Sequence, residues 1–400
     1  MWPGSGGVTD LIRIVPAVVA WILLAPGPAS AQGTVYATME VSVAQVFDGN
    51  LFAAPASRGP QADLISRMGP AFDVGYRSIP LEFAFRYAMD AERYTRHAEL
   101  NRTVARQEAQ VGLRYRPNER VGLSANASYL ATQTPGELNL ESLLAVGRAR
   151  ADRASMRAGV TYARSPVGTI ALAYAFARDA LAGGIRTATS DVQMGLERRT
   201  GTRSAYRLRY SFRRLVFGEA AGSNVGATIH VISGAWIRAI TPRTSLEIEL
   251  GPQVAERSIR PELSATLRRR LRHGELSAGY SRTLITAIGE QGIVDVERVS
   301  LAGAYRLARG FTVTGAPVLA RSTRDEARVA IYALDLGATV ELTRRLSLVA
   351  SGRIGHQEGT LGDSREKIPF RTFALQLTLA VPSSAAAGRR GAHTHLLQRN

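Results

Sequence analysis

The chain has 400 residues, of which 45% are hydrophobic and 21% charged, a composition that fits neither a disordered nor a collagen-like protein. It contains no Cys, which excludes disulfide frameworks, thiolate metal sites and cysteine nucleophiles. Lys and Arg outnumber Asp and Glu by 50 to 33, giving a net charge of +17, and Lys367 is the only lysine. The excess charge is therefore carried by arginine, whose planar guanidinium suits bidentate contacts with anions.

The N-terminus predicts an export signal. A short apolar run, Ile14–Ala25, is followed by two prolines and by the small residues Ala29-Ser30-Ala31, which is the pattern of a secretory signal peptide cleaved after Ala31. The run is shorter than the about 20 apolar residues of a spanning helix. We expect a signal peptide over 1–31, one exported domain over 32–382 and a disordered periplasmic tail over 383–400.

From Thr34 to Val381 the chain alternates apolar and polar residues, the period-two pattern of β-strands. The segments match the about 9–11 residues with which a tilted strand crosses a bilayer, rather than the about 5–6 of a soluble sandwich. Eighteen strands are predicted, at 34–46, 64–77, 80–93, 103–116, 121–133, 151–164, 168–178, 190–200, 203–216, 227–240, 244–256, 261–272, 274–286, 293–307, 310–321, 328–342, 345–356 and 368–381.

Short and longer connections alternate along these segments, and both ends of the predicted domain fall on the side of the short ones. In lipid every backbone group must be paired and no sheet edge can remain, which requires a closed barrel with an even number of strands. The sequence therefore predicts an all-β fold, a transmembrane antiparallel up-and-down β-barrel of about 18 strands. Sixteen strands are the alternative, because 151–164 and 261–272 alternate weakly and Arg269 falls on the lipid-facing side.

Aromatic residues give an independent indication of a membrane, since Tyr and Trp favour the membrane–water boundary. Four tyrosines lie just before short turns on the apolar side of their strands: Tyr76, Tyr115, Tyr162 and Tyr305. We expect them to form the periplasmic aromatic girdle. The alternative is that they pack within a water-soluble barrel.

The first hairpin carries a recognisable pattern. Val41–Phe52 reads VSVAQVFDGNLF, and Asp63–Pro70 reads DLISRMGP. This resembles the β-barrel porin family of outer-membrane proteins, some of which occur with exopolysaccharide or exosortase systems; Gly49 departs from the usual acidic or amide residue. The resemblance implies an outer-membrane barrel in a Gram-negative-type envelope. Asp48 and Asn50 are best explained as turn-forming residues.

The polar side of the predicted strands would face the lumen. It carries the arginines Arg67, Arg86, Arg106, Arg114, Arg157, Arg207, Arg209, Arg213, Arg238, Arg268, Arg270 and Arg353, together with the acids Glu82, Asp90, Glu108, Glu197, Glu247, Glu249, Asp335 and Glu341. Two interpretations stay open. Arg–carboxylate ladders would hold the wall rigid, whereas unpaired arginines, with Arg207, Arg209 and Arg213 as the best candidates, would favour anions in a pore.

The residues from about Thr134 to Asp152 form the longest apolar connection, which either folds inward as a constriction or forms a short helix outside. The sequence contains little evidence for a catalytic site. His230 is expected on the inward side of its strand without a Ser–His–acid set, and His393 and His395 supply only two metal ligands. We expect no enzyme activity, no cofactor and no metal.

The sequence thus predicts an outer-membrane channel that passes polar, anionic solutes or a secreted exopolysaccharide through an arginine-lined lumen. A structural or docking barrel with a closed lumen is the first alternative, and an outer-membrane barrel enzyme is the second. Expected partners are outer-membrane lipid and lipopolysaccharide, then an anionic polysaccharide and periplasmic secretion components, with no nucleic acid.

Overall fold

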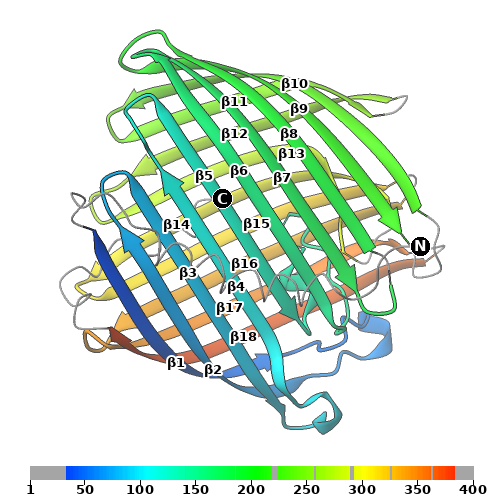
Figure 1. The fold of residues 1–400 in the computed structure, drawn as a ribbon. Helices are drawn as coiled ribbons and strands as arrows, with labels where there is room; N and C mark the ends of the chain where they lie inside the picture. Colours follow the sequence, from blue (N-terminus) through cyan, green and yellow to red (C-terminus); the bar gives the residue numbers. More distant parts are fainter. Residues whose placement is uncertain are drawn as a thin grey trace.

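The computed structural model describes residues 33–139, 141–184, 186–218, 224–255, 258–288, 292–324, 327–361 and 364–382. The expected signal peptide and the expected C-terminal tail lie outside the described residues. The described chain is all-β: eighteen strands form one sheet in which each strand pairs antiparallel with the next, and β18 pairs with β1. Figure 1 shows the result, a closed barrel of tilted strands.

The prediction of eighteen strands is confirmed, including the two weakly alternating segments. The strands are β1 (Thr34–Asp48), β2 (Asp63–Arg77), β3 (Leu81–Tyr94), β4 (Arg102–Tyr115), β5 (Val121–Thr132), β6 (Ala151–Ser165), β7 (Gly168–Leu181), β8 (Arg186–Arg199), β9 (Ser204–Gly218), β10 (Asn224–Thr241), β11 (Thr244–Ala255), β12 (Ser258–Arg270), β13 (Gly274–Ile285), β14 (Val294–Ala308), β15 (Phe311–Arg324), β16 (Ala327–Glu341), β17 (Leu346–Leu361) and β18 (Ser364–Pro382). Three single turns of 3₁₀ helix interrupt the loops: η1 (Ala56–Arg58), η2 (Ala98–Leu100) and η3 (Pro135–Glu137).

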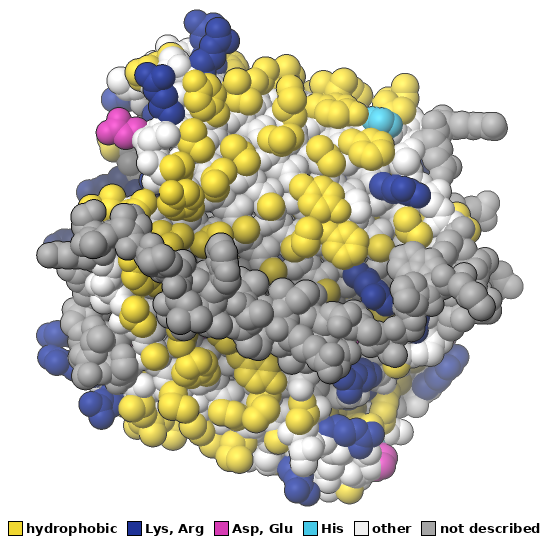
Figure 2. Space-filling model, viewed as in Figure 1, with side chains coloured by type: hydrophobic (Ala, Val, Ile, Leu, Met, Phe, Trp, Pro, Cys, Tyr) yellow, Lys and Arg dark blue, Asp and Glu magenta, His cyan; other side chains and the backbone are white. Residues whose placement is uncertain are grey.

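The outer face of the barrel is apolar. On β1, Met39, Val41 and Val43 are each about half exposed or more, at 64%, 49% and 48%, and the same pattern recurs around the barrel. Figure 2 shows hydrophobic side chains spread over the viewed face, with Lys and Arg mostly toward its edges. Since monomeric proteins rarely expose so large an apolar surface to water, this belt is the lipid-facing surface of a membrane-spanning barrel.

The two ends of the barrel differ. Short turns join β2 to β3, β4 to β5 and so on to β16 and β17, and the described chain begins and ends at this same end, which we call the short-turn end. The longer connections of β1–β2, β3–β4, β5–β6 and β13–β14 lie at the opposite, long-loop end. Among the described residues, no helix is long and apolar enough to cross a membrane.

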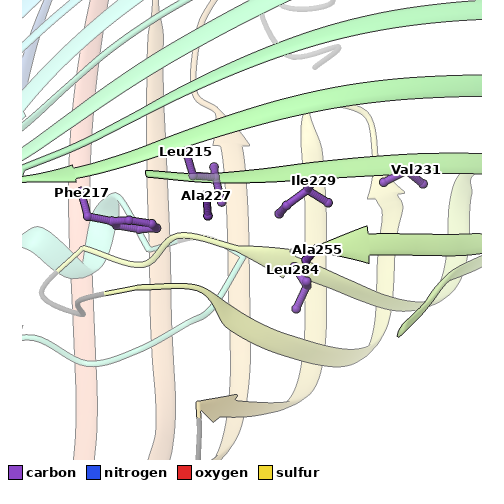
Figure 3. Packing of buried hydrophobic residues seen from close by; sticks show 7 residues of the cluster. All are labelled: Leu215, Phe217, Ala227, Ile229, Val231, Ala255 and Leu284. Atoms are coloured by element: carbon purple, nitrogen blue, oxygen red, sulfur yellow. The ribbon is translucent and has the colours of Figure 1, made fainter. Parts of the chain in front are cut away.

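The inner wall changes character along the barrel axis. Toward the long-loop end it carries apolar clusters; one of them joins Leu215, Phe217, Ala227, Ile229, Val231, Ala255 and Leu284 from β9, β10, β11 and β13 on the lumen side (Figure 3). Toward the short-turn end the strand registers place small residues on the wall, including Gly122, Ser124, Gly159, Thr161, Ala171, Ser277, Gly279, Ala302, Ala304, Thr314, Gly337 and Thr339. Small side chains leave space in the lumen there.

Candidate functional site

The loop of residues 133–150, between β5 and β6, folds into the lumen, and we call it the constriction loop. Leu144 is buried in a cluster with Ala287, Val294, Val296, Ala320 and Ile331, which belong to the β13–β14 loop and to β14, β15 and β16. The backbone N–H of Ala145 donates to Oε1 of Gln357 on β17, with an N···O distance of 2.9 Å. The loop therefore crosses the lumen from the β5–β6 side of the wall to the β14–β17 side. Of the two placements that the sequence left open, an inward constriction and a short helix outside, the structure has the inward one.

Asn139 ties the constriction loop to the β13–β14 loop. Its side-chain amide donates to the carbonyl oxygens of Leu144 and Ile288, at 3.2 and 3.1 Å, and its Oδ1 accepts the N–H of Ile288 at 2.9 Å. Leu138 and Ile288 are packed against each other in one buried cluster. Since buried backbone groups need partners, this amide satisfies both loops where they meet inside the barrel.

Arg148 anchors the far end of the constriction loop to β1 and β3. Its side chain is 6% exposed, and its guanidinium lies 3.4 Å from carboxylate oxygens of both Asp48 and Glu92. It also donates to the hydroxyl of Tyr94, whose ring it covers at 5.1 Å. Arg67 on β2 binds Glu92 at 2.5 Å. The loop end is thus held by a buried network of charge-assisted hydrogen bonds.

The start of the loop is held by a second network. Glu137 accepts a hydrogen bond from Nε of Arg106 on β4, at 3.2 Å, while Nη2 of the same arginine lies 2.7 Å from Glu108. Next to Arg148, Gly147 lies close to the β1–β2 loop, because a Cβ added there would approach the carbonyl oxygen of Phe52 to 2.8 Å. The loop is therefore fixed at its start, middle and end.

Most of the arginines expected to line the lumen do face it, and eight of the twelve are paired with carboxylates. Arg86 lies 2.7 Å from Asp73 and 3.1 Å from Glu40. Arg114 lies 3.3 Å from Glu82, and Arg353 is bound by Asp335 through two hydrogen bonds of 2.7 and 3.1 Å. These contacts form the Arg–carboxylate ladders, one of the two interpretations of the lumen.

The three arginines of β9 are also neutralised. Arg207 lies 3.1 Å from Glu197 and 3.0 Å from Glu247. Arg209 lies 2.6 Å from Glu249 and 3.3 Å from Glu262, and Arg213 lies 3.2 Å from Glu262 and 3.7 Å from Asp191. The interpretation of these three arginines as unpaired lumen charge is therefore wrong. The registers of neighbouring strands bring carboxylates from β8, β11 and β12 to the same part of the wall.

A different set of arginines faces the lumen without a carboxylate partner. Arg199, Arg268, Arg270 and Arg306 are exposed, lie on the inward side of their strands at the short-turn end, and form no ion pair within the described ranges; we call them the mouth arginines. Glu275 and Glu341 face the same mouth. Arg157, deeper in the lumen, makes only a 3.2 Å hydrogen bond with Gln193 in the described part of the chain.

Arg238 and His230 lie on the outer face, so their expected inward placement is wrong. The register of β10 against β9 pairs Arg238 with Ser204 and His230 with Phe212, on the side where Tyr206 and Leu208 are exposed to lipid. The guanidinium of Arg238 covers the Trp236 ring at 5.6 Å. The expectation that the polar side of a strand faces the lumen failed for this strand, because β10 carries apolar residues on both faces.

The histidines that the structure describes show no catalytic arrangement, and His393 and His395 lie outside the described residues. His230 is hydrogen-bonded through Nδ1 to the Tyr210 hydroxyl on the lipid-facing surface. His97 contacts Asp63 at 2.8 Å through Nδ1 and Gln61 at 3.1 Å through Nε2, so both ring nitrogens are occupied in joining two loops. Among the described residues, no group of three His, Asp or Glu side chains could hold a metal ion.

The four tyrosines of the expected girdle lie near the short turns on the outer side of their strands. Tyr115, Tyr162 and Tyr305 are 38%, 42% and 39% exposed. Tyr76 is on the same face, opposite Phe83 in the register of β2 and β3. Their placement is the one that interfacial aromatic residues take in membrane barrels.

Fold and lumen together define an all-β, closed 18-strand membrane-spanning barrel with an inward-folded loop. No protein-family profile and no curated protein matches the sequence. Solved structures with a similar fold include *Acinetobacter baumannii* OccAB4 (TM-score 0.48, 6% identity, covering 89% of this chain and 100% of that one) and *Pseudomonas aeruginosa* OpdQ (0.47, 10%, 87% and 98%). The siderophore receptor PirA from *P. aeruginosa* gives a TM-score of 0.46 at 9% identity, covering 86% of this chain and 80% of that chain.

Proposed function

We propose that this protein is an outer-membrane channel of a Gram-negative-type envelope that passes polar, anionic solutes. The observation that carries the proposal is the lumen itself: β5–β7 and β13–β16 carry small residues on the inner wall of its short-turn half, and its long-loop half is narrowed by the constriction loop. A barrel of this strand number is wide enough for an aqueous path, and an inward loop sets its narrowest part. A secreted exopolysaccharide is the finer candidate for the solute.

The anion preference rests on the mouth arginines. The arginines of β9 are matched by carboxylates, whereas Arg199, Arg268, Arg270 and Arg306 face two acids, Glu275 and Glu341. Unpaired arginines around a pore raise the local concentration of anions and lower that of cations. Selectivity should therefore arise at the short-turn mouth.

Single-channel recording in planar bilayers tests both parts. The mature chain should give a steady conductance with a reversal potential that favours chloride over potassium. Replacing Arg199, Arg268, Arg270 and Arg306 by Gln should remove this preference, and Glu275→Gln with Glu341→Gln should strengthen it.

Arg198→Gln with Arg269→Gln is the control for Arg268→Gln with Arg270→Gln, a mouth variant that removes the same charge, because Arg198 and Arg269 lie at the same end on the lipid-facing side. This control should change the preference much less than the mouth variant. The absence of any conductance from folded, inserted protein would support the alternative of a closed structural or docking barrel. A preference unchanged in the mouth variant would refute the anion path.

A further inference from the structure

A group of arginines lies on the lipid-facing side of β6–β9 at the long-loop end. Arg178 on β7, Arg186 on β8 and Arg214 on β9 are exposed, and each occupies the outward side of its strand. Arg150, directly before β6, interacts electrostatically with Tyr129, whose side chain also points outward. We call Arg150, Arg178, Arg186 and Arg214 the outer arginine patch.

The patch has little charge compensation. Asp152 is the one carboxylate of the described chain on this part of the outer face, and it interacts electrostatically with Arg150, Arg178 and Arg186. No ion pair joins any of the four arginines to a carboxylate within the described ranges. Counted over the described residues, the patch has an excess of three positive charges at the edge of an apolar surface.

The side chains directly below the patch are apolar. Met156 on β6 is 46% exposed and lies one outward position beyond Ala154, the register partner of Arg178. Val192 on β8 is 40% exposed and lies one outward position beyond Ser190, the register partner of Arg214. An unpaired guanidinium facing lipid is unfavourable, and its free-energy cost is largest at the bilayer midplane and smallest near the interface. A ligand with acyl chains that contact these apolar side chains and with anionic groups that contact the arginines would match the patch and the apolar surface beside it.

We propose that the outer arginine patch binds the phosphorylated headgroup of a lipid in the outer leaflet. Arginine binds phosphate through two parallel hydrogen bonds, and longer loops mark the outer side of such barrels. An excess of three charges exceeds the about −1.5 to −2 of one phosphate monoester. The patch thus fits a lipid whose headgroup carries two phosphates. This site is independent of the proposed channel activity.

Native mass spectrometry of the full mature protein in detergent tests the proposal, with bisphosphorylated lipid A and its phosphate-free derivative as probes. The protein should retain the bisphosphorylated lipid and bind the phosphate-free lipid at least tenfold more weakly. Changing Arg150, Arg178, Arg186 and Arg214 together to Gln should weaken binding by a similar factor. Millimolar inorganic phosphate should not displace the lipid; full displacement would indicate a simple anion site and overturn the proposal.

The matched control changes Arg164, Arg198, Arg243 and Arg309 to Gln, which removes the same charge at the short-turn end. Equal loss in both variants would show a non-specific charge effect and overturn the proposal. Asp152→Asn covers the case in which the patch variant does not fold. This single change removes the opposing charge and should tighten binding severalfold, whereas unchanged or weaker binding would count against the site.

Discussion

At the scale of single residues, Arg209 is the clearest case of an arginine that stabilises the wall instead of the permeating ion. It lies between Glu249 and Glu262, whose side chains are 10% and 11% exposed. Arg209→Met would leave two nearly buried carboxylates with one partner fewer, and breaking a buried pair costs roughly 3–5 kcal/mol. We expect a fall in the free energy of unfolding near the lower value, measured by urea titration of the refolded barrel.

Two controls separate lost pairing from lost packing. Adding Glu249→Gln alone to Arg209→Met should restore much of the stability, because Arg209 is the ion-pair partner of Glu249 within the described residues, whereas Glu262 keeps Arg213. Arg268→Met, at an exposed mouth position, should stay within about 0.5 kcal/mol of the parent. A mouth variant as unstable as the Arg209 variant would contradict this division of roles.

At the scale of elements, the constriction loop is the part that narrows the barrel. Replacing residues 133–150 by a short Gly-Ser turn removes Leu144 from its cluster and Arg148 from its network, yet leaves the pairing of β5 with β6 intact. We expect a folded barrel whose single-channel conductance rises severalfold. Asn139→Leu is the milder test. It leaves both backbone groups of Ile288 without a partner, at a cost of about 1–3 kcal/mol each, and should produce fluctuating rather than uniformly raised conductance.

The sequence predicted the strands well and the loops and side-chain partners poorly, for physical reasons. Alternation survives even in β12, where Arg269 faces outward at the membrane edge, because an arginine there can reach water. The inward side of β10 was predicted wrongly, because that side carries Ile229 and Val231, which pack in an apolar cluster in the lumen instead of contacting water. The neutralisation of Arg209 depends on acids from β11 and β12, whose nearness follows from strand register.

At the scale of the whole molecule, the barrel predicts an orientation. The described chain starts and ends at the short-turn end, and β1 closes on β18. The connections longer than five residues, β1–β2, β3–β4, β5–β6 and β13–β14, all lie at the other end, although the two-residue connections β11–β12, β15–β16 and β17–β18 also lie there and depart from the expected alternation. In outer-membrane barrels the short turns face the periplasm. Because the protein has no cysteine of its own, a single introduced cysteine can be labelled to show on which side of the membrane its loop lies.

Ser57→Cys in the β1–β2 loop and Arg309→Cys in the β14–β15 turn form a matched pair of exposed reporters. In intact cells a membrane-impermeant maleimide should label the cysteine at 57, and should label the one at 309 only after the outer membrane is permeabilised. Both positions should react equally in the purified protein, which controls for local accessibility. The reverse pattern would place the mouth arginines outside and the outer arginine patch in the periplasmic leaflet, so it would overturn the assignment of that patch to an outer-leaflet lipid while leaving the anion preference of the lumen open to the same conductance test.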